Sequence, residues 1–62
     1  LGNFQNAYDK FYALFLKQTD NVEINYYLAM SSMKLKLYDE TTAAFERVLI
    51  IKKIMLYSYV ML

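Results

Sequence analysis

The chain has 62 residues, of which 58% are hydrophobic and 21% charged, and its seven basic and six acidic residues give a net charge of +1. A chain of this length forms one small domain, which buries only about 60% of the surface that its unfolded form exposes. We therefore expect part of its apolar surface to face a partner, a second copy or further chain. Because the chain begins with Leu1 rather than Met, we expect it to be a fragment or a processed product.

The composition also argues against several functional classes. No basic run is longer than Lys52-Lys53, so the charged footprint of a nucleic-acid-binding protein is missing. The chain has no Cys and no His, and therefore lacks thiol chemistry and the commonest general base and metal ligand. The apolar run 54–62 is nine residues long. A membrane-spanning helix needs about 20 residues, so we do not expect membrane insertion.

Two helices are predicted in the first part of the chain. The first spans about residues 4–17, where apolar residues recur at helical spacing on one side. The polar stretch 18–21 is a normal length for a link between helices, and Asp20 or Asn21 is suited to cap the next helix. That second helix spans about residues 22–36. Its apolar residues lie on nearly all sides, which is typical of a helix packed against several neighbours.

A third helix is predicted from a cap at Asp39 to about Lys53. The stretch 54–62 contains no Pro, Gly, Asn or Asp, so nothing local forces the helix to stop. Two alternatives stay open: the helix continues, or residues 56–62 begin a fourth helix. Ile, Val and Tyr also favour strands, which leaves a strand as a third possibility for this tail.

An internal repeat connects the first and third helices. Residues 4–15 align with residues 38–49 at a constant separation of 34, which is the period of a helix-turn-helix repeat. The aligned pairs are Phe4 with Tyr38, Ala7 with Thr41, Phe11 with Phe45 and Leu14 with Val48.

At these positions the chain resembles the tetratricopeptide repeat family. The matching features are the aromatic Tyr38 after the turn, the acidic Asp39-Glu40, and the small pair Ala43-Ala44 before Phe45. Tyr27-Leu28-Ala29 is similar to the large-then-small pattern of the family's inner helix. Four positions depart from the family, which usually has tryptophan, glycine, alanine and proline where this chain has Asn25, Lys36, Thr41 and Lys53.

The resemblance implies an all-α, antiparallel helix-turn-helix solenoid fragment with three helices plus the start, or a continuous extension, of a fourth. Residues 1–21 would be the outer helix of a first repeat, residues 22–55 one full repeat, and residues 56–62 the start of a third.

The family binds segments of other proteins, usually in a groove lined by the inner helices. Carried onto this sequence, the resemblance implies partner-binding residues at Glu23, Tyr26, Tyr27, Met30, Met33 and Lys34. Tyr and Met provide large, adaptable contact area. The clamp for a terminal carboxylate that some members carry is not matched, since only Lys34 fits it. The alternative interpretation of the four apolar residues is that they pack against neighbouring helices.

We therefore expect a protein-interaction or scaffold module that binds a protein or peptide and uses no cofactor or metal. Catalysis is not expected. Ser31-Ser32 and Lys34 suggest a Ser-Lys pair, but Ser32 and Lys34, two residues apart, point to different sides of one helix, and no phosphate-binding loop is present. The alternative function is self-association, as a dimer or swapped array through exposed apolar helix faces. It is favoured by the rule that about three helical repeats are needed to bury one another's faces.

Overall fold

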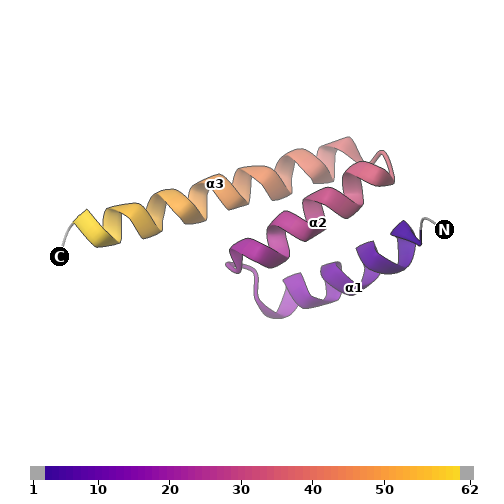
Figure 1. The fold of residues 1–62 in the computed structure, drawn as a ribbon, viewed down its shortest axis with the longest axis horizontal. Coiled ribbons are helices and arrows are strands. Elements are labelled where there is room, and N and C mark those ends of the chain that lie inside the picture. Colours follow the sequence, from indigo (N-terminus) through magenta and orange to yellow (C-terminus); the bar gives the residue numbers. More distant parts are fainter. Residues whose placement is uncertain (1–2, 61–62) are drawn as a thin grey trace.

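The computed structural model describes residues 3–60, and these residues form three α-helices: α1 (Phe4–Lys17), α2 (Val22–Lys34) and α3 (Tyr38–Val60). The expectation of an all-α chain is confirmed for this part of the sequence, and the strand alternative for the tail is wrong as far as Val60. α2 lies between α1 and α3, antiparallel to each, and packs against both (Figure 1). The molecule is elongated, with extents of 46 × 20 × 17 Å.

The first turn is fixed by Asn21, one of the two predicted caps. Its side-chain Oδ1 accepts a hydrogen bond from the backbone N–H of Ile24 at 3.0 Å. This bond satisfies one of the N–H groups that a helix start leaves without an intrahelical partner. The cap is therefore Asn21 rather than Asp20, and α2 begins at Val22 as predicted.

The second turn ends α2 two residues earlier than the sequence predicted. Lys36 has a positive φ of 63°, the left-handed conformation in which glycine is usual. The N–H of Leu37 donates to the carbonyl of Ser32 at 2.9 Å, and that of Lys36 donates to Met33 at 3.0 Å. This pair of bonds is a Schellman motif, which closes α2 without a glycine.

α3 begins directly after this motif, because the carbonyl of Leu37 accepts the first helical hydrogen bond, from the N–H of Thr41 at 2.9 Å. The prediction of Asp39 as the cap was therefore wrong. Asp39 and Glu40 lie within the first turn of α3 instead, where carboxylates stabilise the positive end of the helix dipole.

The core is small, and half of its residues are polar. Among residues 3–58, whose burial the structure describes, four apolar residues are buried, namely Leu28, Ala29, Ala44 and Val48, together with the polar Asn25, Ser31, Ser32 and Thr41. The fully buried Ala29 and Ala44 have almost no side chain, which lets α2 and α3 approach closely. The Ser32 and Thr41 hydroxyls lie 2.9 Å apart and form a hydrogen bond between these two helices. Thr41, which departs from the family's alanine, therefore has a partner that an alanine would lack.

α3 extends well beyond the helix that covers it. It has 23 residues against 13 in α2, so at 1.5 Å per residue it is longer by roughly 15 Å. Of the alternatives for the tail, the structure shows the continuous helix through Val60, with residues 56–60 part of α3. Met61 and Leu62 lie outside the described residues. Figure 1 shows this end of α3 reaching past the turn between α1 and α2.

Candidate partner-binding surface

The six residues predicted to bind a partner share one side of α2. Successive helical residues are rotated by about 100° around the axis, so the six fall within an arc of roughly 120°. The buried residues of α2 lie on the opposite side. Tyr26 and Tyr27 keep 46% and 48% of their surface exposed. Glu23, Met33 and Lys34 are exposed too, and Met30 is half-buried. The structure therefore brings the predicted residues together on one surface.

Four aromatic rings from three helices form a connected row at this surface, which we call the aromatic strip: Phe11, Tyr27, Tyr26 and Phe45. Tyr27 stacks on Phe11 of α1, with ring centroids 5.3 Å apart and planes at 22°. Tyr26 meets Phe45 of α3 edge-on at 6.1 Å, and the two tyrosines meet each other edge-on at 5.9 Å. The strip therefore runs from α1 across α2 to α3.

Phe11 and Phe45 were not among the predicted site residues. From the sequence they were aligned only as equivalent positions of the internal repeat, whereas in the structure both are half-buried and contact the tyrosines of α2. The signal that could have found them was their 34-residue separation, since it places them at equivalent positions of α1 and α3, the two helices that pack against α2. Each tyrosine ring packs against a neighbouring ring and still exposes nearly half its surface, so the packing interpretation accounts for part of each ring and partner binding stays a prediction.

Charged groups stand at the two ends of this surface. Glu23 lies in the first turn of α2 and Lys34 in the last, which at 1.5 Å per residue separates them by roughly 16 Å along the axis. The Lys34 ammonium lies 5.8 Å from the centroid of the Phe4 ring, a cation–π distance. A bound segment would therefore meet an acidic group at one end and a basic group at the other.

A second cluster joins α1 to α3 on the side away from the strip. The Arg47 Nε donates to the Asn25 side-chain oxygen at 2.6 Å, and the guanidinium lies 4.3 Å from the Phe15 ring centroid. A hollow of about 190 Å³ lies beside these groups. Its lining residues are Tyr12, Phe15, Leu28, Glu40, Ala43 and Arg47. Arg47 of α3 therefore contacts both Asn25 of α2 and Phe15 of α1, so it connects the three helices.

Tyr8 completes the link between α1 and α3 by donating its hydroxyl proton to the Glu40 carboxylate. Burial raises the pKa of Tyr8 to about 12, and the hydrogen bond to Glu40 and the negative charge of that carboxylate add to the shift. The phenol therefore stays protonated at neutral pH and acts as a hydrogen-bond donor.

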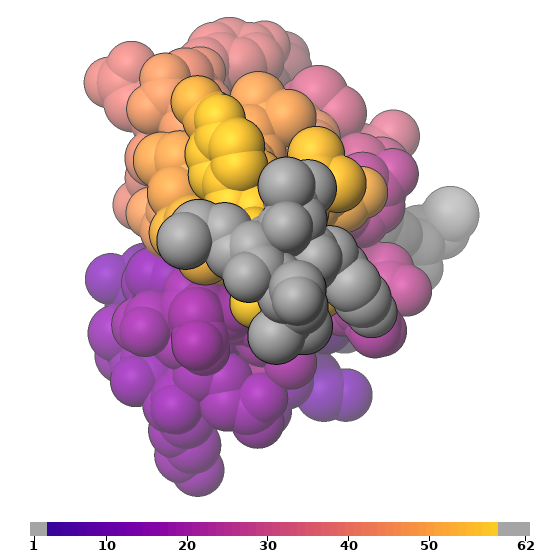
Figure 2. Space-filling model, turned by 90° about the vertical axis from the view of Figure 1, so that its left-hand side faces the viewer, coloured from indigo at the N-terminus to yellow at the C-terminus, as the bar shows by residue number. Residues whose placement is uncertain are grey.

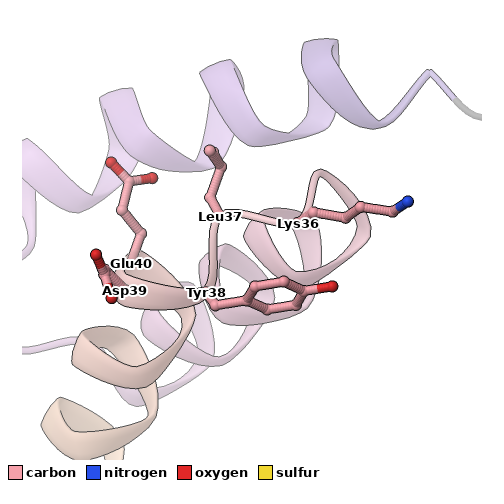
Figure 3. A pocket seen from close by; sticks show the side chains of 5 residues that line it. All are labelled: Lys36, Leu37, Tyr38, Asp39 and Glu40. Carbon is pink, nitrogen blue, oxygen red and sulfur yellow. The ribbon is translucent and has the colours of Figure 1, made fainter.

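A wider hollow of about 420 Å³ adjoins the turn between α2 and α3, lined by the consecutive residues 36–40. In Figure 3 the side chains of Leu37 and Glu40 point toward α1, while Tyr38 lies along the turn. The Glu40 carboxylate accepts a hydrogen bond from the Tyr8 hydroxyl. The backbone N–H of Leu37 takes part in the Schellman motif that ends α2. Both residues already take part in contacts that hold the turn, so we assign no binding role to this hollow.

The hydroxyls considered for catalysis also have structural partners. Ser31 donates to the carbonyl of Tyr27 at 2.6 Å, and Ser32 donates to that of Ala29 at 2.9 Å. Within residues 3–60, no three potential metal ligands come together. In the same part of the chain no helix is long and apolar enough to cross a membrane.

Comparisons of the chain with protein-family models, with curated proteins and with solved structures found no match. The resemblance to tetratricopeptide repeats therefore rests on the sequence pattern described above and stays a prediction.

Proposed function

We propose that the chain is a protein-interaction module that binds a segment of a partner protein along the exposed side of α2. The observation that carries this proposal is the aromatic strip, in which residues of all three helices supply one continuous row of rings at the surface. Contiguous apolar patches on small proteins mark binding sites, and Tyr, Phe and Met are enriched in interfaces. The tyrosines are also held by their neighbours, so little side-chain entropy is lost when a partner binds.

We also propose that α1, α2 and α3 are the outer, inner and outer helices of a tetratricopeptide-like array. The positions of Phe11 and Phe45 support this assignment, because residues 34 apart in sequence contact adjacent tyrosines of the helix between them. The antiparallel packing of α2 against both neighbours is compatible with it. In such an array the side of α2 that carries the strip is the side that faces the binding groove.

The surface also indicates what its partner segment should contain. The roughly 16 Å between Glu23 and Lys34 corresponds to about five residues of extended chain at 3.3 Å each. We expect this segment to place apolar side chains over the strip, a basic residue near Glu23 and an acidic residue near Lys34. The opposite charges at the two ends would fix the direction in which the segment binds.

A selection from a displayed random peptide library, followed by fluorescence-anisotropy titration of the selected peptides, tests this proposal. Tyr27→Ala is expected to weaken binding by about 10-fold or more, as truncation of a central aromatic contact does. Tyr38→Ala is the matched control, since Tyr38 is exposed but lies outside the strip. The proposal fails if the selected peptides are insensitive to Tyr27→Ala, or if Tyr38→Ala weakens them equally.

A charge swap tests the direction of binding. The double variant Glu23→Lys with Lys34→Glu keeps the net charge and exchanges the two ends of the surface. A second selection on this variant should yield peptides with basic and acidic ends exchanged. Peptides with an unchanged charge order would show that these two residues do not orient the partner.

A further inference from the structure

α3 carries one stripe along its length, and α2 covers only the first half of it. The stripe consists of Thr41, Ala44, Val48, Ile51 and Met55, spaced alternately by three and four residues. This spacing is that of the contact positions of paired helices. The first three residues are buried, Ile51 is half-buried, and Met55 is 53% exposed. The stripe thus continues past the point where α2 begins, and its end at Met55 stays exposed.

The accessible surface of the whole molecule is larger than that of a compact monomer of its mass. The accessible surface is 4946 Å² for a chain of 7.4 kDa. A compact monomer of this mass exposes about 4200 Å² by the usual scaling of area with mass. The excess of roughly 700 Å² is close to the 800 Å² or so that each partner buries in a stable dimer interface.

We propose that two copies of this chain pair through the uncovered end of the stripe, with the two α3 helices antiparallel about a two-fold axis. α2 already packs antiparallel on the first half of the stripe, so the second copy's α3 would lie end to end with α2 and continue the same kind of packing. A two-fold axis uses the same surface on both copies, which lets one apolar stripe cover another.

A hollow lies between the first turn and α3 at this place. It measures about 300 Å³ and is lined by Asp20 of the first turn and by Ile51, Ile54 and Met55 of α3. Figure 2 looks at the molecule from this end, with α3 in the upper part of the view and the purple segment that includes the first turn below. Apolar side chains of the second copy's α3 would fill the hollow. This surface is separate from the aromatic strip, so pairing and partner binding can be measured independently.

Sedimentation equilibrium of the 62-residue chain over a range of concentrations tests the pairing. The expected result is a reversible monomer–dimer equilibrium. The double variant Ile54→Glu with Met55→Glu places charges in the contact and is expected to weaken the dimer by about 100-fold or more. Both residues are more than half exposed in the single chain, so the helices should still form, which far-ultraviolet circular dichroism checks.

The same helix provides a matched control. Leu49 and Leu56 are 68% and 62% exposed and lie on the other side of α3, about 100° or more from Ile51 and Met55 at 100° per residue. Leu49→Glu with Leu56→Glu adds the same charge to the same helix and is expected to leave the dimer intact. Equal loss in both double variants would overturn the assignment of the contact to this stripe.

A crosslink locates the contact without relying on loss of stability. Because the chain has no cysteine, Met55→Cys is expected to give a disulfide-linked dimer under mild oxidation, and Leu49→Cys is not. The proposal is overturned if the chain stays monomeric at every concentration and Met55→Cys does not crosslink. It is overturned equally if the monomer co-sediments with phosphatidylcholine–phosphatidylserine vesicles, which would assign the stripe to a lipid surface.

Discussion

Replacement of Asn25 by alanine is expected to be among the most damaging single changes in this protein. Asn25 is fully buried, and its amide donates to the carbonyls of Thr19 at 3.0 Å and Asn21 at 2.8 Å. Its oxygen accepts from Arg47 Nε at 2.6 Å. The Asn25 side chain therefore forms hydrogen bonds that connect α2 with the first turn and with α3.

The expected loss of stability follows from these three hydrogen bonds. A hydrogen bond contributes about 0.5–1.5 kcal/mol net, and a truncated buried side chain leaves a cavity as well. Asn25→Ala should therefore cost roughly 2–4 kcal/mol. Small domains are stable by roughly 0.05–0.15 kcal/mol per residue, which gives about 3–9 kcal/mol for a chain of this length. The substitution would remove a large share of the free energy of unfolding.

Urea unfolding followed by circular dichroism at 222 nm, at a fixed protein concentration, measures this loss. Asn6→Ala is the matched control, because Asn6 is an exposed asparagine within α1, and it should change stability by less than about 0.5 kcal/mol. A double-mutant cycle with Arg47→Ala should give a coupling of about 1 kcal/mol or more. The reasoning is refuted if Asn25→Ala costs no more than Asn6→Ala, or if the coupling is zero.

Two further predictions concern the turn and the tyrosine pair. Lys36→Gly should stabilise the chain by about 0.5–1 kcal/mol, since glycine adopts a positive φ without strain. The midpoint of urea unfolding measures this gain in stability, and a lower midpoint than that of the unchanged chain would contradict the prediction. Because the pKa of Tyr8 is raised to about 12 in the folded chain, the unfolded chain releases this proton first, near pH 10. The stabilising contribution of Tyr8 is therefore complete below pH 10 and is lost between pH 10 and 12. This contribution amounts to about 1 kcal/mol at most for a partly solvated pair. Between pH 10 and 12 the unfolding free energy of Tyr8→Phe should therefore fall less steeply than that of the unchanged chain. An identical fall in both proteins would contradict the assignment.

The bounds of α1 and the start of α2 were predictable because they are marked locally. The polar stretch 18–21 contains the cap, and the periodic apolar residues of α1 give its bounds to the residue. The end of α2 was missed because Lys36 adopts the left-handed conformation, and a lysine gives no signal for it in the sequence. The end of the third helix could not be predicted either, since a stretch without Pro or Gly permits a helix but does not require one.

The candidate surface was predictable in part for a similar reason. The six residues from Glu23 to Lys34 were predicted from the resemblance to tetratricopeptide repeats, and helical spacing places them on one side of α2. The rings that extend it onto α1 and α3 depend on how the helices pack. The role of Asn25 could not be predicted for the same reason. Its hydrogen bond with Arg47 depends on how α3 packs against α2.

The small size of the core explains why so much apolar surface faces outward. Ala29, Ser32, Ala44 and Thr41 fill the contact between α2 and α3 with small side chains, so the two backbones are close and leave no room for larger groups. The tyrosines and Met33 of α2 lie on the open side, and the large apolar residues in the second half of α3, such as Ile54 and Met55, stay exposed. A larger side chain at Ala44 would push the helices apart and open the strip between Tyr26 and Phe45. The close packing that limits the core is thus also what holds the rings of the proposed binding surface in contact.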